Sequence, residues 1–247
     1  MQALPPMVDV AFVHAGPDDA PWVAEVLDPG ELARWQAMRP AARPLFLAAH
    51  VGVRMVAAFR LIWAGPEPAP APALSSFGWN PGPTGKPHLT YRDGSPLPLH
   101  VSVAHAAKTA LVAAAGHGPI GVDVEHVEPR RPLVALARRF FSPAEAAAVE
   151  SAATDSRVAL FHQLWTRKEA VLKATGAGLR GGLSVPVDGP ADRDGWRRVE
   201  LPGRDAPMFV CDLRSPDAAL VAALAIEGQP GAVRQMTLME LTDGRTD

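Results

Sequence analysis

Two carboxylates lie two residues apart in a short, β-rich segment, Ile120–Glu125. Side chains two residues apart on a strand point to the same face. Two neighbouring carboxylates repel each other unless a cation or a proton lies between them. Hard divalent ions such as Mg²⁺ take oxygen ligands of this kind. Asp123 and Glu125 are therefore candidate metal ligands, and the alternative is a pair of solvent-facing acids on an edge strand.

A third acid and a lysine stand one helical turn apart later in the chain. Glu169 and Lys173 are spaced i, i+4, in the order that favours an ion pair on a helix, and that ion pair is the structural alternative. The apolar stripe of this helix includes Trp165 and Ala170, so Glu169 lies at its border. A carboxylate there could bind a metal or accept a proton, and Lys173 could hold a phosphate as a point charge.

Two further segments could bind phosphate. Gly85-Lys86-Pro87 is not a Walker loop, because neither the required earlier glycine nor a Ser or Thr after the lysine is present. Lys86 is then a lysine on a rigid turn, either solvated or placed against a phosphate. His105 follows Ala104 in a run of small residues whose backbone N–H groups are open to an anion; a structural histidine is the alternative. The histidine spacing and the single cysteine, Cys211, exclude a zinc centre.

In order and spacing, these segments together resemble the Sfp-type 4′-phosphopantetheinyl transferases. The strand motif Gly-[Ile/Val]-Asp-[Ile/Val]-Glu matches Gly121–Glu125, and Phe-[Ser/Thr]-x-x-Glu matches Phe141–Glu145. Trp-[Ser/Thr/Ala]-x-Lys-Glu-[Ala/Ser]-x-x-Lys matches Trp165–Lys173. The family's Gly-Lys-Pro and Asn-x-Ser-His segments look like Gly85–Pro87 and Ser102–His105. The resemblance covers about residues 30–182.

The resemblance implies an Mg²⁺-dependent transfer, with Mn²⁺ as an alternative ion. The 4′-phosphopantetheine group of coenzyme A would pass to a serine of an apo acyl or peptidyl carrier protein, with release of 3′,5′-ADP. The carrier could serve polyketide, nonribosomal peptide or fatty acid biosynthesis.

The resemblance also implies roles for individual residues. The implied metal ligands are Asp123, Glu125 and Glu169. The implied catalytic residues are Asp123, Glu169 as general base, and Lys173 on the pyrophosphate. The implied coenzyme A contacts are Lys86, Gly85, Ala104, His105, Lys173 and Arg43, with Arg34 as the next match to Arg43.

Three positions depart from the family pattern. Ser102 and Ala104 replace the family's Asn and Ser, and His50 replaces an arginine common four residues before Arg54. Histidine is a weaker cation at neutral pH, which could loosen binding of the 3′-phosphate. These departures support the alternative of a non-catalytic binder of coenzyme A or a carrier protein. Glu145 is interpreted as a helix-capping residue.

Composition limits the class of protein. The chain has 247 residues, 24 Lys+Arg against 26 Asp+Glu, 48% hydrophobic and 20% charged residues, values typical of a globular protein. This balance leaves no electrostatic footprint for nucleic acid. No uninterrupted apolar run approaches the roughly 20 residues that span a bilayer, and Met1–Pro6 lacks the features of a secretion signal. We expect a cytoplasmic protein that binds neither nucleic acid nor membrane, and by resemblance a monomer.

The elements that must position these residues alternate between strand and helix patterns. Gly65–Ala73 should be an extended spacer, Phe77–Pro98 mostly loops and turns, and Asp243 onward a polar tail. The expected helices begin at Asp28, span Pro44–Trp63, run from Ser142 to Ala153, and run from Asp155 to Gly176. The expected strands are Val8–Val13, His100–Val103, Thr109–Ala115, Ile120–Glu125, Phe209–Leu213, Ala219–Ile226 (with Leu220–Ile226 central) and Val233–Leu241.

Strand, helix and strands thus appear on both sides of about residue 118. The sequence predicts an α+β protein, and the resemblance implies a pseudo-dimeric two-lobe fold in which each lobe is a small antiparallel sheet packed with helices. Residues 1–118 would form the N-terminal lobe. Residues 119–247 would form the C-terminal lobe, which carries the metal-site motifs.

Overall fold

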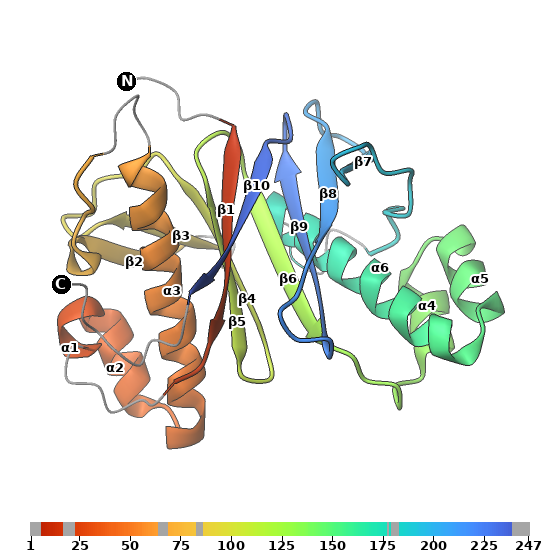
Figure 1. Ribbon diagram of the computed structural model, residues 1–247, viewed down its shortest axis with the longest axis horizontal. Coiled ribbons are helices and arrows are strands. Elements are labelled where there is room, and N and C mark those ends of the chain that lie inside the picture. Colours follow the sequence, from red (N-terminus) through yellow and green to blue (C-terminus); the bar gives the residue numbers. More distant parts are fainter. Residues whose placement is uncertain are drawn as a thin grey trace. The chain divides into compact units, whose positions relative to one another are not determined.

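The computed structural model describes residues 6–16, 23–63, 69–82, 86–176, 178 and 183–238. Its contacts divide the chain into two compact units. Unit 1 contains residues 1–117 and 231–247, and unit 2 contains residues 118–230. Each unit combines a sheet with helices (Figure 1), so the α+β class expected from the sequence is confirmed.

The main sheet of unit 1 has the strand order β10-β1-β5-β4. Strands β1 (Met7–His14), β5 (Thr109–Ala115) and β4 (His100–Ala106) are antiparallel neighbours. Strand β10 (Ala232–Leu238) instead runs parallel to β1 and places Arg234 opposite Asp9. The C-terminal lobe was expected to include residues 119–247, but residues 231–247, which contain β10, belong to unit 1. A local pattern of apolar residues can predict that β10 exists, but not which strand it pairs with.

The core helix of unit 1 is α3 (Arg43–Ile62), close to the expected span. A proline in its first turn starts the helix. Its apolar residues pack with those of β1 and β5 in one buried cluster. The stretch 40–62 is long and apolar enough to cross a bilayer, but 67% of its most apolar window is buried inside the protein. Arg54 and Arg60 interrupt it, and both are fully buried.

A two-stranded antiparallel sheet occupies part of the segment expected to be loops. It pairs β2 (Phe77–Pro81) with β3 (Pro87–Tyr91), so that expectation is wrong for these residues. The two prolines pair with each other at the strand ends, where a missing N–H costs little. Phe77 and Leu89 bury their side chains in the core of unit 1, and this burial stabilises the hairpin despite its turn-forming residues.

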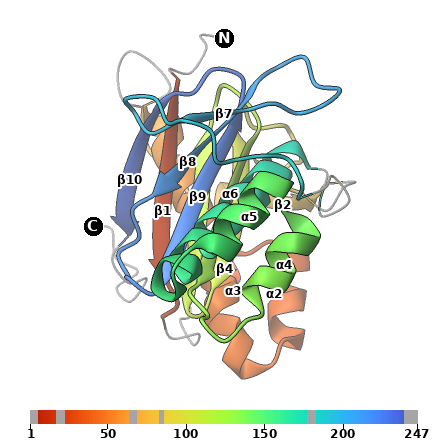
Figure 2. The same ribbon diagram turned by 90° about the vertical axis from the view of Figure 1, so that its right-hand side faces the viewer.

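The sheet of unit 2 has the order β6-β9-β8-β7 and is antiparallel throughout. Its strands are β6 (Ile120–His126), β9 (Leu220–Glu227), β8 (Met208–Leu213) and β7 (Arg197–Val199). The apolar strand β9 is central, as expected. The helix α6 (Thr154–Thr175) packs on β6 and β9, and α4 (Leu133–Phe140) and α5 (Pro143–Ser151) pack beside it (Figure 2).

Capping residues set several helix ends. Asp28 and Glu31 form a capping box at the start of α2 (Pro29–Ala37), and Ser142 and Glu145 form another at the start of α5. Gly176 ends α6 with a left-handed backbone, φ = 68°. The helix limits expected at Asp28, Ser142 and Gly176 are confirmed. The helix α4 has no side-chain cap. Neither α4 nor the single turn α1 (Val23–Val26) is among the helices expected from the sequence.

Some expectations fall outside the described residues. These are Gly85, part of the spacer at 65–68, the end of the last predicted strand at 239–241, and the tail from Asp243.

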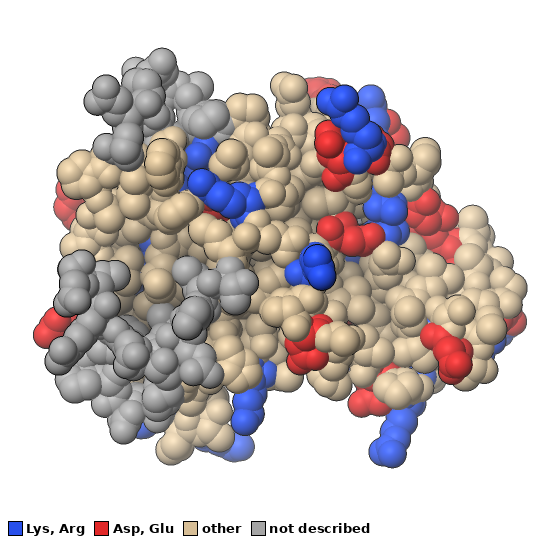
Figure 3. Space-filling view, in the orientation of Figure 1, with Lys and Arg blue, Asp and Glu red and all other residues tan. Residues whose placement is uncertain are grey.

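Acidic and basic side chains are interspersed on the face shown in Figure 3. This distribution agrees with the near-neutral count of 24 basic and 26 acidic residues.

Candidate functional site

Gly121 allows α6 to lie directly on β6. A Cβ atom at Gly121 would stand 2.0 Å from the carbonyl oxygen of Ala170 and 2.3 Å from the backbone nitrogen of Ala174. Only glycine permits two backbones to approach this closely. The turn of α6 that carries Glu169 and Lys173 is thereby held against the strand that carries Asp123.

Asp123 is buried, with 5% of its surface exposed, although β6 is an edge strand. The alternative of a solvent-facing Asp123 is therefore wrong. Its Oδ1 accepts a hydrogen bond from Lys173 Nζ at 2.7 Å, while its buried Oδ2 has no partner among the described residues. Burial raises the pKa of Asp123 to about 7, Lys173 opposes this rise, and the charges of Glu125 and Glu169 add to it.

The other two acids lie within electrostatic reach of Asp123 and of each other. Burial raises the pKa of Glu169; Lys173 acts against this rise and Glu125 adds to it. Glu125 is partly exposed and lies 3.8 Å from Arg131. Lys173 forms its ion pair with Asp123, in place of the i, i+4 pair with Glu169 that the helix spacing favoured.

The chemistry of these groups fits a cation only in part. The partnerless Asp123 Oδ2 and the mutual repulsion of three carboxylates are what a divalent ion would relieve. However, among the residues that the structure describes, no three acidic, histidine or cysteine side chains form a group that could hold a metal. The three acids are neighbours rather than a preformed set of ligands.

Glu145 does more than cap α5. Its Oε2 accepts hydrogen bonds from Ser142 and, at 2.6 Å, from Lys168 Nζ, and its Oε1 accepts one from the backbone of Val187. Lys168 Nζ also donates to the carbonyl of Val185 at 2.6 Å. This buried pair ties the start of α5 and the segment after α6 to the residue that precedes Glu169. The sequence shows both residues, but nothing in it shows that they meet.

Unit 1 contains a cavity of about 580 Å³, a size typical of small-molecule sites. Its wall is mostly apolar, with His50, His105 and Lys108 as its basic residues. The remaining lining residues are Ala15, Gly16, Met38, Ala41, Ala42, Pro44, Leu45, Phe46, Ala49, Trp79, Val103 and Ala107.

The residues expected to contact coenzyme A are placed differently with respect to this cavity. His105 is exposed and lines the cavity, whereas Ala104 beside it is buried. Lys86 is partly exposed and is not in the lining. Arg43 donates from Nε to the carbonyl of Met38 and from Nη2 to that of Gln36, so it stabilises the end of α2.

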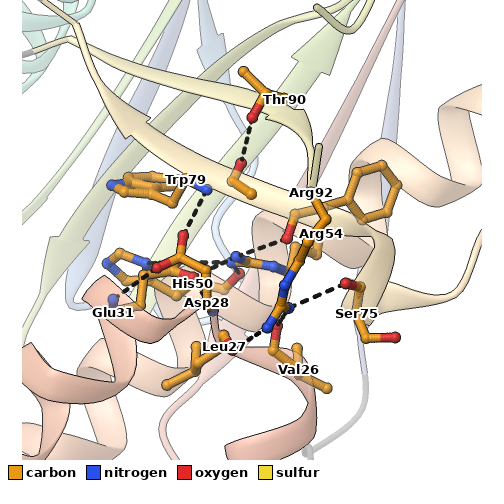
Figure 4. A network of polar contacts seen from close by, with 12 residues as sticks. Val26, Leu27, Asp28, Glu31, His50, Arg54, Ser75, Trp79, Thr90 and Arg92 are labelled. Carbon is orange, nitrogen blue, oxygen red and sulfur yellow. Dashed lines mark hydrogen bonds and ion pairs between the residues drawn. The ribbon is translucent and has the colours of Figure 1, made fainter. Parts of the chain in front are cut away.

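A buried polar network lies behind the cavity wall (Figure 4). Glu31 accepts hydrogen bonds from Arg54 at 2.9 and 2.5 Å, and its Oε1 lies 2.5 Å from His50 Nδ1. Asp28 Oδ2 accepts a hydrogen bond from the backbone of Trp79 at 2.8 Å. Burial acts to raise the pKa of Glu31, but the bonds from His50 and Arg54 outweigh it and lower the pKa to about 2. Sequence reasoning recognised the cap and the His50 substitution but not this network.

Comparison with known proteins assigns the family. The profile of the 4′-phosphopantetheinyl transferase superfamily matches residues 119–212. A Synechocystis protein named as a 4′-phosphopantetheinyl transferase is 36% identical over 176 residues, which make up 69% of this chain and 67% of that protein. The chain belongs to the 4′-phosphopantetheinyl transferase superfamily.

This transferase is also similar to Bacillus proteins, over shorter alignments. A 4′-phosphopantetheinyl transferase of Bacillus subtilis is 34% identical over 143 residues, 56% of this chain and 58% of that protein. The transferase Sfp of Bacillus subtilis strain 168 is 31% identical over 114 residues, 45% of this chain and 48% of Sfp. The expected Sfp-type family and the transferase class are confirmed. The chain thus spans about half the length of these Bacillus relatives.

The superfamily match falls entirely on unit 2 of this phosphopantetheinyl transferase. Asp123, Glu125, Glu169 and Lys173 all lie inside residues 119–212, within unit 2. The cavity and the network around Glu31 belong to unit 1 and lie outside that match.

Proposed function

We propose that the chain transfers the 4′-phosphopantetheine group of coenzyme A to a serine of an apo acyl or peptidyl carrier protein. The serine Oγ forms a bond to the phosphorus nearer the pantetheine. The bond from that phosphorus to the bridging oxygen breaks, and 3′,5′-ADP leaves with the electron pair. The observation that carries the proposal is the close contact of α6 with β6, which holds Lys173 against Asp123 in a member of this superfamily.

Glu169 is the proposed general base. Its carboxylate would take the proton of the serine hydroxyl, directly or through one water. Burial raises its pKa, which makes the ionised carboxylate a better proton acceptor near neutral pH. Lys173, at 33% side-chain exposure, is open enough to reach the pyrophosphate while it remains close to Asp123.

The proposed metal ligands are Asp123, Glu125 and Glu169, with Mg²⁺ as the ion and Mn²⁺ as the alternative. The partnerless Oδ2 of Asp123 supports this assignment. When bound, the ion would neutralise charge on the diphosphate and orient it. Asp123 is already held by Lys173, and burial is the main cause of the raised pKa values of Asp123 and Glu169, with the charge of Glu125 adding to both.

The proposed coenzyme A contacts are Lys173 in unit 2 and, in unit 1, Lys86, Gly85, Ala104, His105 and Arg43. His105 is supported by its place in the cavity wall. Arg43 would have to act through Nη1 or the second N–H of Nη2, because Nε and one N–H of Nη2 donate to the carbonyls of Met38 and Gln36. Ala104 can contribute only backbone groups, since its side chain carries no donor.

A non-catalytic binder of coenzyme A or of a carrier protein is the second candidate function. It is favoured by Ser102, Ala104 and His50, none of which supplies the side chain that the family pattern has at its position. Ser102 is moreover buried, at 3% exposure. These departures lie in unit 1 and leave the three acids of unit 2 intact.

The test incubates the purified protein with an apo carrier protein, coenzyme A and Mg²⁺, and follows the intact mass of the carrier. Gain of one phosphopantetheine group on the carrier serine is expected, with loss of transfer in Asp123→Asn and Glu169→Gln. Glu150→Gln, an exposed acid paired with Arg138, is the matched control. Binding of coenzyme A without transfer would overturn the proposal in favour of the second candidate.

The cellular setting is also part of the proposal. We infer a cytoplasmic monomer whose partners are coenzyme A and carrier proteins, and that binds neither nucleic acid nor membrane. A panel of apo carriers from polyketide, nonribosomal peptide and fatty acid systems, compared by kcat/KM, would identify the preferred partner.

A further inference from the structure

His50 forms part of the cavity wall, and its ring is fixed from behind (Figure 4). Its Nδ1 lies 2.5 Å from Oε1 of Glu31, which Arg54 also holds. Phe46 stacks on the imidazole with 3.9 Å between the ring centroids, and the Trp79 ring is tilted against it with 4.4 Å between the centroids. The ring therefore has one orientation, with Nδ1 directed at Glu31.

The protonation state of His50 follows from these neighbours. The ionised Glu31 can only accept a hydrogen bond, so Nδ1 carries the proton. Burial lowers the pKa of His50, the charges of Arg34 and Arg54 lower it further, and Glu31 acts against them. A neutral imidazole protonated on Nδ1 has a lone pair on Nε2. Among the residues that the structure describes, none forms a hydrogen bond with Nε2.

The rest of the wall suits a planar ring next to an anion. Leu45, Val103 and Trp79 provide apolar and aromatic surface, while His105 and Lys108 provide basic groups on the same wall. A lone pair at His50 would repel a phosphate oxygen but would accept an N–H. His50 therefore does not replace the missing family arginine as a cation.

We propose that this cavity takes the adenine ring of coenzyme A and that Nε2 of His50 accepts a hydrogen bond from the ring's amino group. The inference rests on the proposed function, because coenzyme A is the donor substrate there. His50 is then a residue that determines specificity for the base, and Glu31 is a positioning residue that fixes its tautomer.

The first test compares two nucleotides by calorimetry: adenosine 3′,5′-diphosphate and purine riboside 3′,5′-diphosphate, which lacks the amino group. The wild-type protein is expected to bind the adenine nucleotide about five- to tenfold more tightly, the size of one hydrogen bond. His50→Phe keeps a ring between Phe46 and Trp79 but loses the acceptor, so both nucleotides should bind alike. His126→Phe, an exposed histidine of unit 2, is the matched control and should keep the preference. A preference that persists in His50→Phe overturns the inference.

The second test needs no variant and covers the case in which His50→Phe fails to fold. In protein labelled with ¹⁵N-histidine, His50 should give the spectrum of a neutral ring protonated on Nδ1 at pH 7. Its Nε2 resonance should shift when adenosine 3′,5′-diphosphate is added and not with the purine analogue. An imidazolium spectrum, or no shift with either nucleotide, contradicts the inference.

The two levels of the proposal can fail separately. If the carrier gains no phosphopantetheine but the nucleotide preference and the Nε2 shift are found, the base-binding inference stands and the transferase proposal falls. If transfer occurs and the two nucleotides bind alike, the transferase proposal stands and the base-binding inference falls.

Discussion

Surroundings give the acids of this chain opposite properties. Asp123 is buried beside one lysine, its Oδ2 has no hydrogen-bond partner in the part of the chain that the structure describes, and its pKa rises to about 7. Glu31 is buried just as deeply, but donors from His50, Arg54 and the backbone of Asp28 hold it, and its pKa falls to about 2. The surroundings of Asp123 suit a carboxylate that binds a cation. Those of Glu31 suit a permanently ionised carboxylate that orients other groups.

Glu31 should dominate the acid stability of unit 1. Its pKa is about 2 in the folded protein against 4.5 as the ordinary value, so the unfolded chain binds more protons between these pH values. Stability should therefore rise by about 3 kcal/mol from pH 2 to pH 4.5 and be lost as pH falls through that window. Urea unfolding at a series of pH values measures this slope.

Variants separate Glu31 from the other acids. Glu31→Gln should flatten the slope and lower stability at pH 7, because Arg54 loses its buried counter-ion. Glu200→Gln, which removes an acid 76% exposed, should leave the slope unchanged. An equally steep acid transition in Glu31→Gln would show that other groups are responsible.

Lys173 should act on the substrate as well as on Asp123. Lys173→Met removes the charge proposed to hold the pyrophosphate, so the KM for coenzyme A should rise at least about tenfold. Steady-state kinetics with a carrier protein measures this. Unchanged kinetics would restrict Lys173 to its ion pair with Asp123.

The contact between β6 and α6 is the element-scale feature on which the candidate site depends. Gly121→Ala should push α6 away from β6, since its Cβ meets the backbone of Ala170 at 2.0 Å. We expect a loss of about 1–3 kcal/mol in stability, together with a larger fractional loss of transfer than stability alone explains. Unfolding curves and transfer rates on the folded variant measure the two effects.

A second glycine supplies the control for this substitution. At Gly189 an added Cβ would come no closer than 3.7 Å, to the carbonyl of Arg198, which is ordinary contact. Gly189→Ala should therefore change neither the free energy of unfolding nor the transfer rate appreciably. If Gly121→Ala behaved the same way, the close approach would not be what positions Glu169 and Lys173.

The pair of Glu145 and Lys168 should be strongly coupled. Glu145→Gln leaves a buried ammonium without its counter-ion, which costs roughly 3–5 kcal/mol, as does the reverse variant Lys168→Met. The double variant should be less destabilised than the sum of the two, and a double-mutant cycle of unfolding free energies measures the coupling. Additive effects would mean that the segment at Val185–Val187 holds α6 without this pair.

At the scale of the whole molecule, the last strand belongs with the first. Asp9 is fully buried, and its Oδ1 accepts a hydrogen bond from Arg234 of β10 at 2.5 Å, while Arg60 lies 3.8 Å from Oδ2. Arg234 and Asp9 are 225 residues apart in the sequence. Their pair ties the C-terminal part of the chain to unit 1.

Breaking this tie should affect unit 1 selectively. Arg234→Met leaves a buried carboxylate with one distant partner and should cost roughly 3 kcal/mol. Hydrogen exchange should then speed up in β1 and β10 while β6 and β9 keep their protection. Arg198→Met, in an exposed pair with Glu200, should cost less than about 1 kcal/mol. Uniform loss of protection in both units would contradict the prediction.

Local patterns predicted the elements that depend on nearby residues. The capping boxes at Asp28 and Ser142, the helix over 44–63 and the central strand β9 all followed from periodicity or from a few neighbouring side chains. The hairpin of β2 and β3 was missed because its stability comes from Phe77 and Leu89 in the core, against the tendency of its own glycines and prolines. The helix α4 has no side-chain cap to mark its start, although Leu133, Leu136, Ala137 and Phe140 recur at helical spacing.

By itself, the sequence determined the superfamily and the positions of the acids, because motif spacing along β6 and α6 is a local property that needs no knowledge of packing. The tertiary structure alone decided that Asp123 is buried with one oxygen that has no partner among the described residues, that Lys173 pairs with it, and that His50 faces Glu31. Each of these depends on contact between segments far apart in the chain, and burial then sets their charge.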